Sequence, residues 1–217
     1  MVIYGDSHAE MWFDALNNIA KEAHWRLVDL GKGYCPADSL PYRNPSGWGT
    51  PGGEYAACDQ WHRFAIRRIA QLKPELVVVT QDVPPGPDPR QWQRGLEVTL
   101  DGLDVPKTRI VVLGNIPILP QNPPDCLSRH VSDIQACSGP VRTALTPFNQ
   151  AEKAAADSAG VRYIGITSWF CSTVCTGVIG RYGVFVDQFH VGATYTYVLQ
   201  DLLRQALHVP TAGPHSS

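Results

Sequence analysis

The sequence has no long apolar segment of the kind that crosses a membrane. No run of hydrophobic residues approaches the ~18–20 positions that a bilayer requires, and the N-terminus has no basic segment followed by an apolar stretch. Neither sign of charge is in large excess, since 18 Lys and Arg are balanced by 20 Asp and Glu, for a net charge of −2. Without a basic stripe or an acidic tail, the chain is unlike nucleic-acid-binding proteins.

The chain is long enough for one domain with a sizeable core. It has 217 residues, of which 44% are hydrophobic. We expect a single domain over residues 1–208 and a disordered, proline-containing tail over residues 209–217. Met1 directly precedes an apparent core strand at residues 2–4, and we therefore expect this domain to have been cut from a larger protein.

Six cysteines form three local pairs that lie almost entirely outside strand and helix patterns. There is no C-x₂-C pair, and Cys171 and Cys175 have no second pair or histidine at zinc-finger spacing. We therefore expect disulfides and no metal, and hence an oxidising, extracytoplasmic compartment. Six cysteines allow about 15 connectivities. Pairing neighbours closes the shortest loops and gives Cys35–Cys58, Cys126–Cys137 and Cys171–Cys175.

Short β-branched runs alternate with segments whose apolar residues recur at helical spacing. This alternation predicts an α/β fold, a three-layer sandwich around a five-stranded parallel sheet of flavodoxin-like type. The strands are expected at residues 2–4, 26–30, 76–80, 109–113 and 162–166, and the helices near 12–23, 61–72, 92–103, 148–159 and 194–207. Three long segments rich in Pro, Gly and Asn fit no regular element, and we expect them to be functional or tied down by the cysteines. They cover residues 31–54, 83–89 and 116–146.

The first strand ends in a sequence suited to nucleophilic catalysis. Ser7 follows it directly, at the edge where parallel sheets bind ligands, and a helix begins at once. Far downstream, Asp187 and His190 precede the last helix at a spacing that lets an acid orient a base. Simpler interpretations exist. Ser7 and Glu10 also fit a helix-capping box, and an Asp-x-x-His pair also occurs in ordinary loops.

Several motifs together resemble a known family. Gly5-Asp6-Ser7 after the first strand and Asp187-x-x-His190 before the last helix resemble the SGNH hydrolase superfamily, across the whole chain. The resemblance implies that Ser7, Asp187 and His190 form a catalytic triad. Within that superfamily, the chain more specifically resembles the SGNH domain fused behind the membrane-embedded acyltransferase-3 domain of bacterial cell-surface O-acyltransferases. That narrower resemblance rests on Gly5-Asp6-Ser7-His8-Ala9, Lys32-Gly33-Tyr34-Cys35-Pro36, Cys58 before Trp61, Ile116-Pro117 leading to Cys126, and Cys171-x₃-Cys175.

The resemblance also implies an oxyanion hole, with a glycine after the second strand and an asparagine after the third. Gly33 is our choice for the glycine because a residue without a Cβ lets its N–H approach a substrate closely, and Gly31 is the alternative. The expected asparagine is absent, since the chain reads Thr80-Gln81-Asp82 there. Asn115 follows the fourth strand, which is the wrong one. We therefore expect the backbone N–H groups of Ser7 and Gly33 to form the oxyanion hole, with the side-chain amide of Gln81 as a further donor.

Four other residues near these motifs have simpler roles. His8 is adjacent to the nucleophile, but in a helical first turn its side chain is expected to point away from Ser7. Asp6 is expected to brace the turn. Trp48 and Trp169 are candidates for stacking on a sugar ring, although packing against the disulfides is the preferred interpretation.

The resemblance implies acyl transfer, with acetyl as the expected group, to a hydroxyl of a bacterial cell-envelope glycan. The donor would be delivered by a fused integral-membrane domain, so the location would be the periplasm or outer membrane face, tethered to the membrane. No cofactor is required. The alternatives are a hydrolase of the carbohydrate esterase, lipase or thioesterase type, and a catalytically silent glycan-binding module.

Overall fold

The centre of the molecule is a parallel β-sheet with the strand order β2-β1-β3-β4-β5. The computed structural model describes residues 1–43, 53–103, 105–141 and 145–211. Adjacent strands in the sheet all run parallel, as the sequence predicts, although the second and fifth strands are shorter than expected. The strands are β1 (Val2–Gly5), β2 (Val28–Gly31), β3 (Leu76–Thr80), β4 (Arg109–Leu113) and β5 (Arg162–Ile164).

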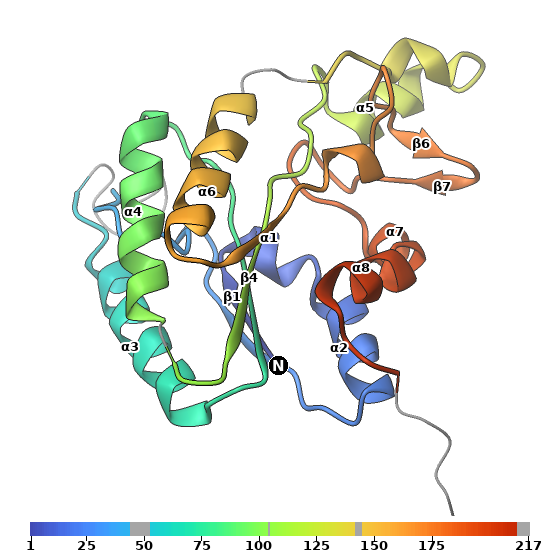
Figure 1. Cartoon of the computed structure of the whole chain (residues 1–217). Helices are drawn as coiled ribbons and strands as arrows, with labels where there is room; N and C mark the ends of the chain where they lie inside the picture. Colours follow the sequence, from blue (N-terminus) through green and yellow to red (C-terminus); the bar gives the residue numbers. More distant parts are fainter. Residues whose placement is uncertain (44–52, 104, 142–144, 212–217) are drawn as a thin grey trace, which may run out of the picture.

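Helices cover both faces of this sheet and complete a three-layer sandwich (Figure 1). One layer contains α3 (Ala56–Leu72), α4 (Pro89–Gly102) and α6 (Thr146–Ser158). The opposite layer contains α2 (Phe13–Glu22), α7 (Ala193–Val198) and α8 (Gln200–Leu207), and the short α1 (Ser7–Glu10) follows directly on β1.

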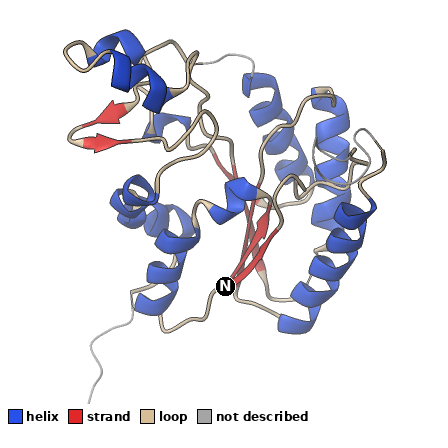
Figure 2. Ribbon diagram, turned by 180° about the vertical axis from the view of Figure 1, so that it is seen from behind, coloured by secondary structure: helices blue, strands red, loops and turns tan. Residues whose placement is uncertain are grey.

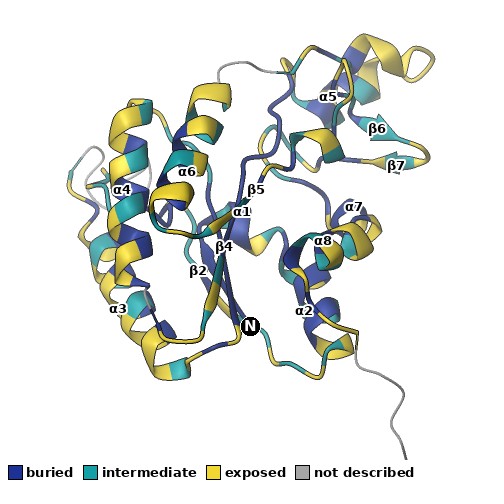
Figure 3. Cartoon of the chain, in the orientation of Figure 1, coloured by how far each residue is buried: buried dark blue, intermediate teal, exposed yellow. Residues whose placement is uncertain are grey.

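Successive side chains along each strand point to opposite faces of the sheet, so the sheet separates two hydrophobic cores. Val77 and Val79 of β3 pack beneath α3, α4 and α6, whereas Leu76 and Val78 pack beneath α2 and α8. The helices turn their buried sides inward and leave their outer sides exposed (Figure 3). This alternation decides where the side chains that follow β3 point.

The structure divides one of the expected helices and adds elements in the long loops. The segment expected as one helix at 12–23 contains only α2, and 194–207 is broken at Leu199 into α7 and α8. The segment 116–146 contains α5 (Pro123–Arg129) and the 3-10 turn η1 (Ile134–Cys137). A further 3-10 turn, η3 (Thr167–Trp169), precedes a small antiparallel hairpin of β6 (Val178–Ile179) and β7 (Tyr182–Gly183), seen from behind in Figure 2.

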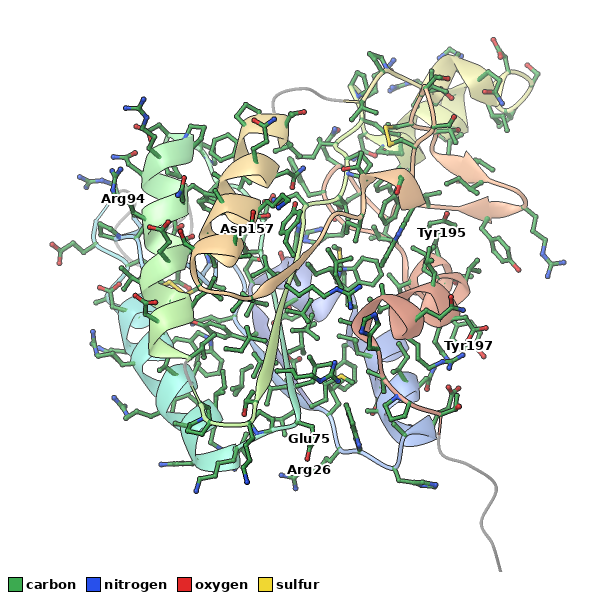
Figure 4. The ribbon with its side chains drawn as sticks, viewed as in Figure 1. Arg26, Glu75, Arg94, Asp157, Tyr195 and Tyr197 are labelled. Carbon is green, nitrogen blue, oxygen red and sulfur yellow. A yellow bond between two sulfur atoms is a disulfide. The ribbon has the colours of Figure 1, made fainter. Side chains whose placement is uncertain are left out.

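All three expected disulfides are confirmed. Cys35–Cys58 ties the loop after β2 to α3, Cys126–Cys137 joins α5 to η1, and Cys171–Cys175 closes a small loop before the hairpin. Sulfur atoms are drawn in yellow in Figure 4. Two of the long irregular segments are therefore covalently held in place.

Two further expectations concern the C-terminal tail and Trp48. Val209, placed by the sequence at the start of a tail, is buried in the core, and its N–H donates to the Arg204 carbonyl at 3.1 Å. The tail is described only to Thr211, and Trp48 lies outside the described residues. Among the described helices, none combines the length and the apolar character needed to span a membrane.

Candidate active site

The backbone at the end of β1 fixes the position of Ser7. Gly5 has φ +156°, and a Cβ added there would lie 1.8 Å from the Thr80 carbonyl oxygen, so only glycine fits between β1 and β3. The buried Asp6 carboxylate then accepts the N–H of His8 and the N–H of Asp82, each at 2.9 Å. Asp6 therefore braces this turn, as expected, and joins it to the segment after β3.

Asp6, and not Ser7, is the N-cap of α1. The capping-box interpretation of Ser7 is therefore wrong, because the hydroxyl is directed elsewhere. Ser7 Oγ lies 2.9 Å from Nε2 of His190, a residue 183 positions away in the chain. The fold thus brings together two side chains from opposite ends of the sequence.

The other ring nitrogen of His190 faces Asp187. Nδ1 lies 2.8 Å from Oδ2 and 3.0 Å from Oδ1 of that carboxylate. When Nδ1 carries the proton donated to Asp187, Nε2 is the nitrogen free to accept the proton of Ser7. The three side chains therefore have the hydrogen-bond arrangement of a nucleophile, a base and an orienting acid.

Asp187 is fixed by the backbone as well as by the ring. Its Oδ1 accepts the N–H of Phe189 at 2.7 Å and the N–H of His190 at 2.8 Å. Partial burial alone would raise the pKa of the carboxyl, but these hydrogen bonds and the His190 ring outweigh it and lower the pKa. Asp187 is therefore held in its ionised form, which is the form that orients an imidazole.

His8, whose side chain is expected to point away from Ser7, lies next to this arrangement. It is buried, and its ring meets that of His190 edge-on, with 5.6 Å between ring centroids. Its Nε2 lies 3.6 Å from Oδ1 of Asp82. Burial lowers the pKa of His8, so the side chain is a neutral packing partner of the His190 ring.

A cavity of about 840 Å³ opens beside Ser7 and His190. Its walls come from the loop after β2, from the proline-rich segment after β3 and from Phe189. Sequence reasoning gave no role to its aromatic residues Tyr34, Tyr42 and Phe189, although Tyr34 and Phe189 lie within the recognised motifs. The other lining residues are Asp6, Gly33, Pro36, Leu40, Pro41, Arg43, Asp82, Pro84, Pro85, Gly86, Pro87 and Gln91.

Trp169, the second tryptophan considered for sugar stacking, lies away from this cavity. It belongs to η3, and its ring packs edge-on against Trp12 with 6.2 Å between centroids. Trp12 is fully buried in the core. Trp169 therefore packs against the core and does not line the cavity, but its ring partner is Trp12 and not, as expected, a disulfide.

The loop after β2 distinguishes between the two glycines considered for an oxyanion hole. The Gly31 N–H donates to the Asp29 carboxylate at 2.7 Å, and the Lys32 N–H donates to the Gly5 carbonyl at 3.0 Å. Neither N–H is therefore available to a substrate. Gly33 lines the cavity together with Ser7, and a Cβ added to it would meet nothing within 4 Å.

Gln81 does not line the cavity, and the expectation that its amide supports the oxyanion hole does not fit its contacts. Its Oε1 accepts the Asp38 N–H at 2.8 Å, and its Nε2 lies 3.5 Å from Oε1 of Glu152. Residue 81 continues the alternation of Val77 and Val79, so its side chain lies beneath α4 and α6. Asp82, on the other face, is the residue that reaches the cavity.

A buried polar network lies behind the cavity wall. Glu152 of α6 accepts the Trp92 indole N–H at 3.1 Å, and burial raises the pKa of its carboxyl to about 8. Burial also raises the pKa of Asp38 to about 6, and the Tyr42 hydroxyl donates to this carboxylate. Through Gln81, the network connects α6 to the loop that carries Tyr42 in the cavity wall.

The α/β fold with its five-stranded parallel sheet matches SGNH-hydrolase-like structures. Residues 1–205 match the family model of the SGNH domain fused to AT3 domains, and the chain belongs to this family. Among curated proteins, none matches the sequence.

Solved structures with the same fold have low sequence identity to this chain. The periplasmic domain of a lipopolysaccharide acetyltransferase from Salmonella ser. Paratyphi A is 17% identical, with a TM-score of 0.77 over 95% of this chain and 83% of that one. A carbohydrate acetylesterase from Sinorhizobium meliloti is 14% identical, with a TM-score of 0.58 over 95% and 97% of the two chains. A lipase/acylhydrolase from Enterococcus faecalis is 11% identical, with a TM-score of 0.58 over 98% of each.

Proposed function

We propose that this domain is a serine-dependent O-acyltransferase that moves an acyl group, acetyl in the first instance, to a hydroxyl of a bacterial cell-envelope glycan. The observation that carries the proposal is the hydrogen-bond series from Ser7 through His190 to Asp187, with distances of 2.9 and 2.8 Å, at the edge of an open cavity. A family defined by fusion to AT3 domains supports transfer, as does the acetyltransferase neighbour.

In the first half-reaction, His190 Nε2 takes the Ser7 proton as Oγ bonds to the acyl carbonyl carbon. The bond to the donor's leaving group then breaks, and the leaving group departs with the proton from His190. In the second half-reaction, His190 takes the proton of a sugar hydroxyl, whose oxygen bonds to the acyl carbon. The bond to Ser7 breaks, Oγ recovers the proton, and Asp187 orients the imidazole throughout.

The backbone N–H groups of Ser7 and Gly33 form the oxyanion hole in this proposal. Both residues line the cavity, and the neighbouring N–H groups of Gly31 and Lys32 are already bonded within the protein. Loss of one donor from such a hole lowers kcat by about 10²–10³. A hole with two backbone donors would therefore be a modest catalyst for generic esters, which suits an enzyme that must retain its acyl group until an acceptor arrives.

The donor in this proposal is presented by an integral-membrane AT3 domain, to which the family model describes a fusion. Three disulfides support a location outside the cytoplasm. We place the domain in the periplasm or at the outer membrane face, tethered to the membrane in the full-length protein. No cofactor or metal enters any step.

A fluorophosphonate probe tests the nucleophile directly. We expect covalent labelling of the native protein that is lost in Ser7→Ala and retained in Ser128→Ala, whose exposed serine on α5 is the matched control. An unlabelled native protein would instead support the catalytically silent glycan-binding module.

Hydrolysis is the second candidate, and the acetylesterase neighbour favours it. Transfer and hydrolysis share the acyl-serine and differ only in whether a sugar or water takes the acyl group. With an aryl acetate as donor, we expect an added pyranoside to accumulate as its acetyl ester and to compete with acetate release. Acetate release that no acceptor changes would establish the esterase instead.

A further inference from the structure

The turn that carries Gly33 has glycine and tyrosine in an unexpected order. The Cys35 N–H donates to the Lys32 carbonyl at 3.0 Å, which makes Gly33 and Tyr34 the two central residues of the turn. Tyr34 has φ +59°, in the left-handed region that favours glycine. Gly33 is not among the residues with positive φ. The local backbone would therefore be better served by a glycine at position 34 than by one at position 33.

Surrounding contacts hold Tyr34 in this conformation. On one side, the Lys32 N–H donates to the Gly5 carbonyl, which ties the turn to the end of β1. On the other, Cys35 is buried and bonded to Cys58 in α3. A strained residue persists only where its surroundings fix it, and such residues gather at ligand sites.

The Tyr34 side chain does not contribute to the core. It is 65% exposed and lines the same cavity as Ser7. Gly33, the residue before Tyr34, lines the cavity as well, and a Cβ added to it would meet nothing within 4 Å. The tyrosine at a positive φ and the glycine at a position that does not require one are both explained if a flat molecule lies against Tyr34 and approaches Ser7 across Gly33.

The chemistry of the wall indicates what that molecule is. An aromatic face carries partial negative charge and attracts the weakly positive C–H groups of a pyranose ring. Polar groups of Asp82 and Gln91 line the same cavity and can bond to ring hydroxyls. Asp82 Oδ1 already accepts the Val83 N–H at 2.8 Å, and Gln91 Oε1 accepts the Asp88 N–H at 3.0 Å. The other carboxylate oxygen of Asp82 and the amide N–H groups of Gln91 can bond to ring hydroxyls, whereas an aliphatic chain would offer them no hydrogen bond.

We propose that Tyr34 is the platform on which a pyranose ring of the glycan acceptor stacks, with the space beside Gly33 admitting the ring that presents its hydroxyl to Ser7. The proposal rests on the proposed function for the role of the bound sugar. The binding itself can be measured without turnover.

Sugar binding is best measured in a Ser7→Ala background, which cannot form the acyl-serine. We expect an O-acetylated methyl pyranoside, titrated and followed by NMR, to bind S7A and S7A/Y34F with similar Kd. S7A/Y34A and S7A/Y34G should bind about tenfold more weakly, because the stacking face is lost. Tyr197→Ala is the control in the same background, since Tyr197 is an exposed tyrosine of α7, labelled in Figure 4, outside the cavity lining.

Tyr34→Gly also reports on the strain. Because glycine adopts positive φ without cost, this variant should be at least as heat-stable as the native protein despite its weaker sugar binding. That combination of results is the one expected of a residue retained for its ligand.

Three results would overturn the platform: no pyranoside binding to S7A, equal Kd in S7A and S7A/Y34A, or a Tyr34→Ala defect confined to esters of long acyl chains. In each of them, retained fluorophosphonate labelling would leave the proposed function intact. Conversely, an unlabelled protein whose pyranoside binding depends on Tyr34 would refute the acyl-serine and keep the platform.

Discussion

At the scale of single residues, the Asp187 carboxylate holds His190 in two ways. It bonds to the ring nitrogen Nδ1 and also accepts the N–H of His190 itself. The ring therefore has one favoured orientation and one favoured tautomer before any substrate arrives. Such preorganisation has its greatest value in the transition state, when the imidazole becomes charged.

Replacing Asp187 with asparagine tests this orientation. In Asp187→Asn, the side-chain amide can donate to Nδ1, which favours the tautomer with its proton on Nε2 and prevents that atom from accepting the Ser7 proton. We expect kcat on an aryl acetate to fall by about 10⁴. Stability should change little, because the carboxylate is 46% exposed.

The matched control is Asp201→Asn, which alters an exposed carboxylate paired with Arg204 on α8. It should retain native kcat. Native kcat in Asp187→Asn would contradict the assigned role of the acid.

The residues that sequence reasoning brought together are those whose motifs adjoin the ends of elements. Ser7 follows β1 and His190 precedes α7, so element order alone brings them to one edge of the sheet. Gln81 was misplaced, although strand alternation from Val77 and Val79 was a signal that placed its side chain on the opposite face. No such signal existed for Glu152, because its contacts join segments 60 and 71 positions apart.

At the scale of elements, the loop after β2 is shaped by its covalent link to α3. Cys35 directly follows Tyr34, and its disulfide to Cys58 spans 23 positions. His62 of α3 adds a hydrogen-bond contact between Nε2 and the Pro36 carbonyl oxygen at 2.7 Å. The wall of the cavity that contains Gly33 therefore depends on α3.

Removing this disulfide should affect both stability and activity. In the double variant Cys35→Ser/Cys58→Ser, we expect the free energy of unfolding to fall by about 3 kcal/mol, because the unfolded chain regains the entropy of a loop of this length. Loosening of Gly33 should lower kcat on an aryl acetate about tenfold, within the effect of losing one oxyanion donor. The far-UV circular dichroism should stay native, because the sheet does not contain these cysteines.

The control variant is Cys171→Ser/Cys175→Ser, which opens a loop of 4 positions outside the cavity lining. It should lose less stability and keep native kcat. Equal loss of kcat in both double variants would indicate a general effect of the disulfides and would contradict a specific link between α3 and the cavity.

Elements with long periodic patterns were predicted closely, whereas those held by local chemistry were not. The strong apolar spacing of α3, α4 and α6 fixed their positions to within a few residues. By contrast, α5 is 7 residues long, and each strand of the β6–β7 hairpin has 2 residues. Elements this short have no detectable period and depend on the disulfides and turns around them.

At the scale of the whole molecule, a protonated Glu152 has consequences for stability. The residue is buried between α6, α4 and the end of β3, where burial raises the pKa of its carboxyl from 4.5 to about 8. Between these two pH values, the unfolded chain has released a proton that the folded protein retains. Each rise in pH across that range therefore favours unfolding.

Glu152→Gln should remove this dependence. The neutral amide oxygen can still accept the Trp92 and Gln81 donors. Below about pH 4.5 the contribution of Glu152 is fully present, and it is lost progressively towards pH 8. We expect the variant to equal the native protein near pH 4.5 and to exceed it by a few kcal/mol at pH 8, as measured by urea unfolding.

The buried Asp38 carboxyl, with its pKa raised to about 6, keeps a smaller slope of the same sign in both proteins. The difference between the two unfolding curves is therefore the informative quantity. Glu75→Gln, at an exposed position, is the control and should follow the native curve. A Glu152→Gln protein that also follows the native curve would show that Glu152 is ionised in the folded state.

The close approach of Gly5 to the Thr80 carbonyl oxygen also matters for engineering this protein. Position 5 does not tolerate a larger residue, since the main chains of β1 and β3 already touch there. The segment from Pro84 to Pro87 lines the cavity beside Ser7, and within it Gly86 has φ +127°, so a side chain at that position would be strained even though a Cβ would meet nothing within 4 Å. A mutant library that seeks a different acyl preference is therefore best concentrated at positions 84, 85 and 87, with the glycines at 5 and 86 held invariant.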